Sequence, residues 1–116
     1  MENFVEIAIY QVKPTKIEEF EGLLGEVVET QKEQPGLIDL KYVKRGYNID
    51  YEQIKEGLPP HRLTKIVKCV KYILIWEFAT KEDYGKALQN LYQKYEKQLN
   101  RCLIMPHDKL LGDRIY

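Results

Sequence analysis

Aromatic side chains that carry a polar atom are frequent in this chain, with nine tyrosines and one tryptophan among 116 residues. Their rings can stack on a planar aromatic molecule, while a phenol O–H or indole N–H holds its polar group. The candidates for substrate binding are Tyr72, Trp76 and Tyr84, and Arg45 or Arg62 could supply positive charge. The alternative is structural, with Tyr72 and Trp76 in a dimer interface and Tyr84 packing a helix on a sheet.

Two other side chains are candidates for acid–base catalysis. Glu77 lies within an apolar run, where burial would make its carboxylate a stronger base, although it could equally reach water or pair with a lysine. His61 ionises near neutral pH and lies in a proline-rich segment that could fold over a cavity mouth. Because neither His61 nor His107 has an acid or nucleophile at a meaningful spacing, a surface role is the alternative, and their separation does not indicate a metal site.

The hydrophobic pattern predicts two long helices and four strands that would position these residues. A capping-box pair, Thr15 and Glu18, opens a helix that ends near Glu33, and Thr80 with Asp83 opens a second helix that ends before Pro106. The segment 63–76 fits a helical period as well, but its β-branched and aromatic side chains favour a strand with a bulge among its lysines. The four expected strands cover residues 4–12, 37–45, 63–76 and 109–115.

This order of elements, β-α-β-β-α-β, predicts an α+β fold of the ferredoxin-like type. We expect one domain over residues 1–116, with a four-stranded antiparallel sheet and both helices on one face. An insert at residues 47–64 separates the second strand from the third. Asp50 with Gln53 could cap a short helix there, and Gly57 could end it.

The central strands are apolar on both faces, so the face without helices also needs cover. We expect this face to carry aromatic side chains. Because a monomer rarely exposes a large apolar patch, a partner should cover this face. A homodimer through the two sheet faces would bury them. The residues expected on this face are Tyr10, Tyr42, Tyr72, Leu74 and Trp76.

The composition argues against several classes of partner and location. Eighteen basic residues balance eighteen acidic ones, which gives no basic footprint for nucleic acid. Glu2 and Glu6 interrupt the N-terminal apolar run, so it does not resemble a signal peptide, and no stretch is long enough to span a membrane. The two cysteines lack a CxxC spacing, and we expect a protein of the reducing cytoplasm.

The chain resembles antibiotic biosynthesis monooxygenase-like domains of the dimeric α+β-barrel superfamily. A strand leading into a lysine–proline turn, a proline–glycine turn before the second strand, and a tryptophan–glutamate pair before a helix occur in the family's order. These motifs are Val12-Lys13-Pro14, Glu18-Glu19-Phe20, Gln34-Pro35-Gly36-Leu37, Ile75-Trp76-Glu77-Phe78 and Glu82-Asp83-Tyr84.

This resemblance implies a small-molecule-binding homodimer and a cofactor-free monooxygenase acting on an aromatic or phenolic substrate. In such an enzyme the electron-rich substrate anion itself would reduce O₂, and the protein would supply hydrogen-bond donors and a dry cavity. The haem-degrading branch carries Asn on its first strand and Trp and His on its second helix, which this chain lacks. A non-catalytic ligand-binding or stress-related homodimer and an isomerase-type enzyme using Glu77 or a histidine remain alternatives.

Overall fold

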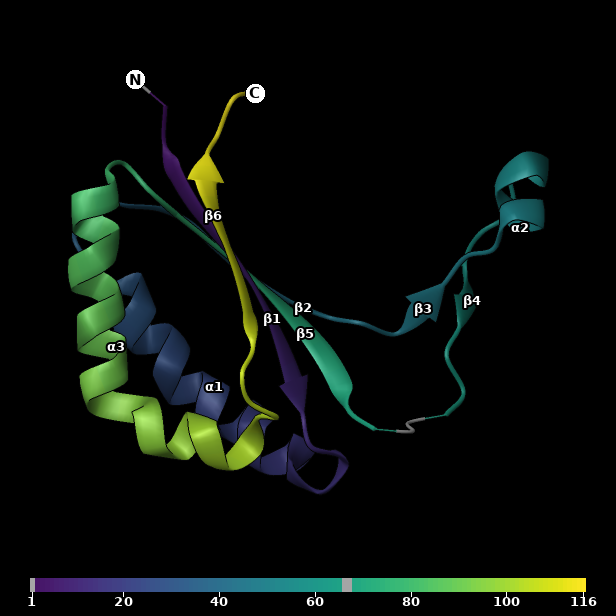
Figure 1. Cartoon of the computed structure of the whole chain (residues 1–116), viewed down its shortest axis with the longest axis horizontal. Helices are drawn as coiled ribbons and strands as arrows, with labels where there is room; N and C mark the ends of the chain where they lie inside the picture. Colours follow the sequence, from purple (N-terminus) through teal and green to yellow (C-terminus); the bar gives the residue numbers. More distant parts are fainter. Residues whose placement is uncertain (1, 66–67) are drawn as a thin grey trace.

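The computed structural model describes residues 2–65 and 68–116 and confirms the ferredoxin-like α+β arrangement. Four antiparallel strands form one sheet in the order β2-β5-β1-β6. Both long helices lie against the same face of this sheet (Figure 1). The elements of this body are β1 (Phe4–Val12), α1 (Ile17–Lys32), β2 (Leu37–Lys44), β5 (Val70–Phe78), α3 (Lys81–Cys102) and β6 (Asp108–Asp113).

The two helices begin in different ways. The Thr80 hydroxyl accepts a hydrogen bond from the backbone N–H of Asp83 at 3.1 Å, which caps α3 as expected. The capping box expected at Thr15 is wrong, because a 3₁₀ turn over Pro14–Lys16 precedes α1 and no side chain caps it. Proline fixes φ at a helical value and needs no N–H partner, so it favours this tight turn at the start.

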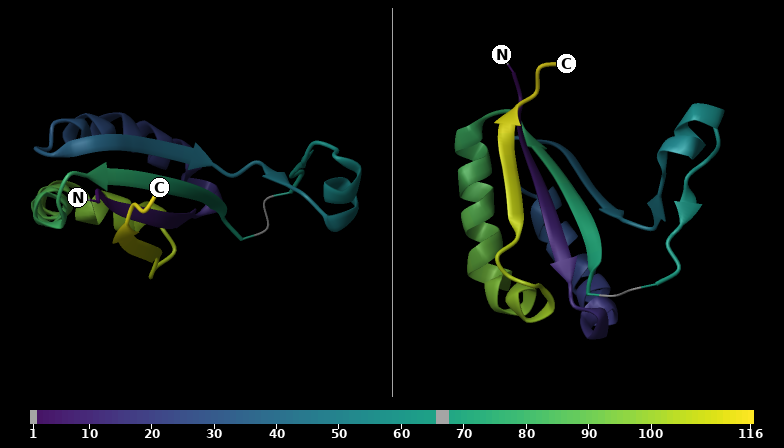
Figure 2. Two further views of the ribbon diagram at one scale, coloured as in Figure 1. Left: turned by 90° about the horizontal axis from the view of Figure 1, so that it is seen from above. Right: turned by 45° about the vertical axis from the view of Figure 1, so that its right-hand side comes forward.

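The insert projects from the body as an arm, which we define as residues 47–64 (Figures 1 and 2). It contains a two-stranded ladder of β3 (Tyr47–Asn48) and β4 (His61–Arg62) and the short helix α2 (Tyr51–Glu56). The expected capping box of Asp50 with Gln53 is present, and Gly57 ends the helix at a left-handed φ of 68°.

Strand β5 is shorter than expected because it begins at Val70 rather than at residue 63. Val70 lies opposite Val12, the last residue of β1, so the ladder with β1 ends there. Lys71 lies in regular register opposite Gln11. The bulge was expected among Lys65, Lys68 and Lys71. This segment includes residues 66–67, which lie outside the described residues.

The face expected to be open is the buried one, so that expectation is wrong. Tyr72 and Trp76 in β5, with exposed fractions of 2% and 0%, pack under the helices with Tyr10 of β1. Alternation predicts two faces but could not choose between them, since both are apolar. The bulky rings fill the layer between sheet and helices. The aliphatic side chains on the open face are Val5, Ile7, Ile9, Val43, Ile73, Ile75 and Leu110, and this face also carries charged side chains, among them Asp39, Lys41, Lys71 and Glu77.

Candidate functional site

A charged residue lies at the centre of the aromatic layer between the sheet and α3. Glu6 of β1 is fully buried and lies directly opposite Trp76 of β5 in the sheet register. One of its carboxylate oxygens, Oε1, accepts a hydrogen bond from the Tyr84 hydroxyl at 2.5 Å. The same oxygen lies 3.1 Å from Nζ of Lys109, which reaches it from β6. We call Glu6, Trp76, Tyr84 and Lys109 the inner polar cluster.

Three polar atoms of this cluster are buried without a hydrogen-bond partner among the described residues. They are Oε2 of Glu6, Nε1 of Trp76 and Nζ of Lys109. Nε2 of Gln31 in α1 also has no partner among these residues, whereas its Oε1 accepts a hydrogen bond from the Tyr42 hydroxyl at 2.8 Å. Nζ of Lys109 is within ion-pair distance of Glu6 but is not aligned for a hydrogen bond. A buried polar atom without a hydrogen-bond partner is unfavourable. A hydrogen bond from a bound molecule to one of these atoms would therefore contribute most to its binding free energy.

The surroundings of Glu6 keep the neighbouring phenol groups neutral. Burial raises the pKa of Tyr84, and its hydrogen bond to Glu6 raises this pKa further. Burial likewise raises the pKa of Tyr10, with smaller contributions from Tyr42 and Glu6. Both tyrosines are therefore hydrogen-bond donors rather than bases, and the carboxylate of Glu6 is the proton acceptor that the cluster offers.

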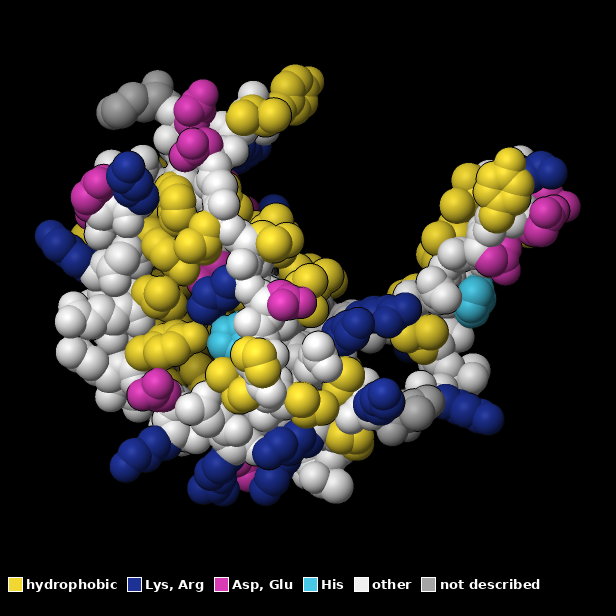
Figure 3. All heavy atoms as spheres, in the orientation of Figure 1, with side chains coloured by type: hydrophobic (Ala, Val, Ile, Leu, Met, Phe, Trp, Pro, Cys, Tyr) yellow, Lys and Arg dark blue, Asp and Glu magenta, His cyan; other side chains and the backbone are white. Residues whose placement is uncertain are grey.

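Lys109 is the member of the cluster that is most exposed to solvent, and it lies in the strip between α3 and β6. The Lys109 side chain is 20% exposed there, whereas that of Glu6 is 0% exposed. Figure 3 shows hydrophobic side chains gathered in this strip together with charged and histidine side chains. Behind the cluster, rings fill the interior, with Tyr84 centred 5.1 Å from Phe4 and 6.0 Å from Phe78. The most exposed side of the cluster therefore lies beside β6, which is an edge strand.

The structure brings two of the expected substrate-binding residues together. The rings of Trp76 and Tyr84 are 6.0 Å apart, and both belong to the inner polar cluster. Tyr72 lies elsewhere on the same face, where its hydroxyl donates to Glu21 and its ring packs on Phe20 at 4.8 Å. Tyr72 also lines a separate cavity of about 280 Å³ between α1 and the β2 edge of the sheet.

The other expected residues lie outside the cluster. Glu77 is buried on the opposite side of the sheet, where Arg114 at 3.2 Å and the Asn3 amide at 2.7 Å hold its carboxylate. His61 lies on the exposed arm, with Nδ1 2.9 Å from Oε1 of Gln53. These placements leave the catalytic roles of Glu77 and His61 as predictions.

The two arginines that were expected to supply positive charge lie at the root of the arm. Arg62 donates to the Tyr47 hydroxyl at 2.7 Å and lies over its ring at 4.8 Å. Arg45 and Arg62 both line a cavity of about 520 Å³ there. The two arginines therefore line the same cavity, and they lie away from the inner polar cluster.

Sequence reasoning missed Glu6 and Lys109 as site residues. The signal for Glu6 was present, because this carboxylate occupies the same strand face as Ala8 and Tyr10, which are apolar and aromatic. Lys109 gave no such signal, since a lysine in a short edge strand usually faces water. Only the pairing of β1 with β6 places Lys109 opposite Ala8 and within reach of Glu6.

Two negative findings apply to residues 2–65 and 68–116. No three histidine, cysteine, aspartate or glutamate side chains gather there into a group that could hold a metal ion. Within the same residues, no helix combines the length and the apolar character that crossing a membrane requires.

Comparisons with solved structures place this fold among antibiotic biosynthesis monooxygenase-like proteins. No protein-family model matches the sequence, and no curated protein matches it. The putative antibiotic biosynthesis monooxygenase from Nitrosomonas europaea superposes with a TM-score of 0.70 at 15% identity, over 99% of this chain and 92% of that chain. A mutant of SnoaB, a cofactor-independent oxygenase from Streptomyces nogalater, gives 0.67 at 13% identity over 100% and 96%.

A conserved protein from Methanosarcina mazei Go1 has a TM-score of 0.68 at 18% identity, covering 97% of this chain and 92% of that chain. At these identities the similarity establishes the shared fold. It confirms the resemblance expected from the order of the sequence motifs.

Proposed function

We propose that this protein is a cofactor-independent monooxygenase that oxidises an electron-rich phenolic molecule at the inner polar cluster. The observation that carries this proposal is a fully buried carboxylate, Glu6, whose Oε2 has no hydrogen-bond partner among the described residues. Trp76, whose indole N–H likewise has no partner among those residues, lies opposite Glu6 in the sheet register. SnoaB, which is described as a cofactor-independent oxygenase, has the same fold and supports the class of reaction.

The cluster contains the groups that activation of such a substrate requires. Oε2 of Glu6 accepts a proton from an acidic C–H or O–H of the substrate. The Lys109 ammonium and the Trp76 N–H then stabilise the resulting anion, and the apolar surroundings strengthen both interactions. Because the anion is electron-rich, it can transfer one electron to O₂, which leaves a substrate radical and superoxide.

Combination of these two species forms a C–O bond and gives a peroxide on the substrate carbon. For a methylene carbon, loss of water from this peroxide leaves a carbonyl group. One oxygen atom of O₂ enters the carbonyl, and the other leaves as water with the two hydrogens of the methylene. The reaction is balanced with O₂ as the only oxidant, and the residues of this chain supply proton transfer and anion binding alone.

We also propose that the protein is a homodimer formed through the open face. This face presents isoleucine and valine side chains, and Ile7, Val43 and Leu110 have exposed fractions of 36%, 47% and 60%. Burying ~600 Å² of apolar surface would contribute roughly 15 kcal/mol before the cost of association. The second copy therefore packs on small aliphatic side chains rather than on the aromatic residues expected from the sequence.

A non-catalytic ligand-binding homodimer is the second candidate function. The rings of Phe4, Phe78, Trp76 and Tyr84 fill the interior, as they would if the aromatic residues were structural. The cytoplasmic location expected from the sequence stays a prediction.

Oxygen uptake with an anthrone as substrate tests the proposal. We expect the purified protein, without added cofactor, to consume one O₂ per anthraquinone formed. Glu6→Gln should lower kcat by roughly 10²- to 10⁴-fold because it removes the proton acceptor and keeps the side-chain shape. Glu77→Gln is the matched control, since it makes the same change on the opposite sheet face.

The outcomes separate the candidate functions. Loss of activity in Glu77→Gln alone would refute the role of Glu6 and favour a base on the other face. Absence of oxygen uptake with anthrones, naphthols and hydroquinones would favour the binding protein.

A further inference from the structure

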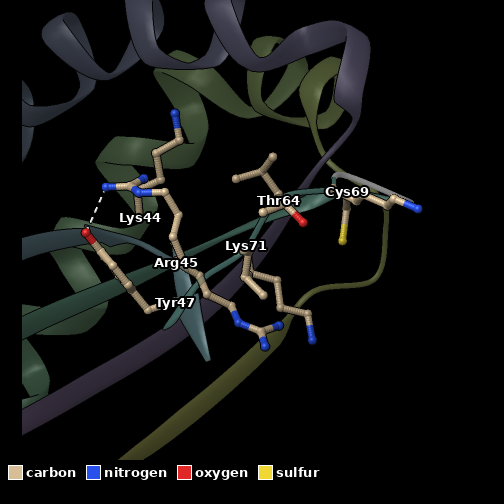
Figure 4. A pocket seen from close by; sticks show the side chains of 11 residues that line it. Lys44, Arg45, Tyr47, Thr64, Cys69 and Lys71 are labelled. Atoms are coloured by element: carbon tan, nitrogen blue, oxygen red, sulfur yellow. Dashed lines mark hydrogen bonds between the residues drawn. The ribbon is translucent and has the colours of Figure 1, made fainter. Parts of the chain in front are cut away.

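A second cavity lies at the root of the arm, away from the inner polar cluster. Its volume of about 520 Å³ is within the range of small-molecule sites. The end of β2, the start of β5 and both ends of the arm form its walls (Figure 4). Two backbone hydrogen bonds join these walls, from Arg45 N–H to the Lys71 carbonyl at 2.9 Å and from Leu63 N–H to the Gly46 carbonyl at 2.8 Å.

Positive charge dominates this cavity, which we call the basic pocket. Five cationic side chains line it, and the described lining residues include no carboxylate. Among residues 2–65 and 68–116, only Lys44 of these five lies within ion-pair distance of a carboxylate, that of Glu21 at 2.7 Å. The cationic lining residues are Lys44, Arg45, Arg62, Lys65 and Lys71.

The remaining lining residues define a partly apolar wall. Leu63, Val70 and the ring of Tyr47 contribute to it, and the contact of Arg62 with Tyr47 holds that arginine in place. Figure 4 shows the side chains of Arg45 and Lys71 extending toward the same side of the pocket. A cleft with charge of one sign concentrates ions of the opposite sign, so the pocket favours an anion that also has an apolar part.

We propose that the basic pocket binds a small organic dianion, such as an aromatic phosphate monoester, at a site separate from the inner polar cluster. The phosphate would contact Arg45 and Lys71, since guanidinium and ammonium groups both suit phosphate oxygens. The organic part would lie against Tyr47 and Leu63. This site does not depend on the oxygenase proposal.

Calorimetric titration with phenyl phosphate tests the site, with inorganic phosphate and phenol as comparison ligands. We expect phenyl phosphate to bind more tightly than either comparison ligand and to bind more weakly as the salt concentration rises. The double variant Arg45→Gln/Lys71→Gln should weaken binding at least about tenfold. The control Lys86→Gln/Lys97→Gln removes the same charge from exposed positions on α3 and should leave the affinity within about twofold.

The two cysteines provide an independent readout of occupancy. Cys69 lines the basic pocket and is partly exposed, whereas Cys102 is buried at the C-terminal end of α3 and serves as an internal reference. Phenyl phosphate should therefore slow alkylation of Cys69 by iodoacetamide and leave Cys102 unaffected.

Any of three results would overturn the proposal. They are no binding at millimolar phenyl phosphate, an equal loss of affinity in both double variants, or binding that leaves the alkylation rate of Cys69 unchanged.

Discussion

Replacement of Lys109 by methionine should strongly destabilise the protein, because it leaves the charge of Glu6 buried without its ammonium partner. The Glu6 side chain is 0% exposed, and the Lys109 ammonium lies 3.1 Å from its Oε1. After the substitution, the Tyr84 hydroxyl is the one hydrogen-bond donor to Glu6 that remains among the described residues. Methionine retains most of the aliphatic length of lysine, so the change removes charge more than packing.

The expected loss follows from the burial of this pair. Removing one partner of a buried ion pair typically costs about 3–5 kcal/mol. Lys109 is 20% exposed, so water can enter beside Glu6 and the lower end, about 3 kcal/mol, applies. With an entropy of unfolding near 2.1 cal/mol/K per residue, 116 residues give roughly 0.24 kcal/mol/K. The midpoint of thermal unfolding should therefore fall by about 12 °C.

Urea denaturation followed by circular dichroism measures this loss, at one fixed protein concentration because a dimer's stability depends on concentration. The double variant Glu6→Gln/Lys109→Met should be more stable than Lys109→Met alone by about 1–2 kcal/mol, since no charge remains buried. If the double variant were less stable than Lys109→Met, Glu6 would not be a buried charge held by Lys109. That result would refute the electrostatic description of the cluster.

Three other perturbations test separate parts of the structure. Burial lowers the pKa of His107 in the folded protein, so below about pH 6.5 the unfolded chain binds more protons than the folded one. Acidification from pH 7 to pH 5 should therefore destabilise wild-type protein more than His107→Asn, as measured by urea denaturation. Equal losses would contradict this. Gly36→Ala should lower the free energy of unfolding by roughly 3 kcal/mol in the same assay, because φ at Gly36 is +82° and the new Cβ would collide with the Asp83 carboxylate. A loss of stability below about 1 kcal/mol would be inconsistent with that geometry. Ile75→Asp should give monomers by sedimentation with the emission maximum of Trp76 unchanged, whereas a red shift would place the indole at the interface.

The sequence predicted the fold well because its local signals agree with the tertiary structure. The caps at Thr80 and Asp50 set the starts of α3 and α2, and the β-α-β-β-α-β order defined the sheet. The start of β5 was harder to predict from the sequence. The segment before Val70 has strand-forming residues, but the ladder with β1 does not continue beyond Val12.

The candidate site was only partly predictable for a related reason. Trp76 and Tyr84 stood out by residue type, and they do meet. Which sheet face the helices cover was not encoded in alternation, because Ile73 and Ile75 are as apolar as the residues beside them. The pairing of Glu6 with a lysine about a hundred positions away depends on β6 joining the sheet edge, which no local pattern specifies.

An anaerobic titration with 1,8-dihydroxyanthrone tests most directly whether the inner polar cluster binds phenolic molecules. The chain has a single tryptophan, Trp76, so its fluorescence reports on this cluster alone. We expect saturable quenching, with affinity reduced at least about tenfold in Glu6→Gln and unchanged in Glu77→Gln. Absence of quenching, or equal affinity in wild-type protein and Glu6→Gln, would contradict the assignment of this cluster as the substrate site.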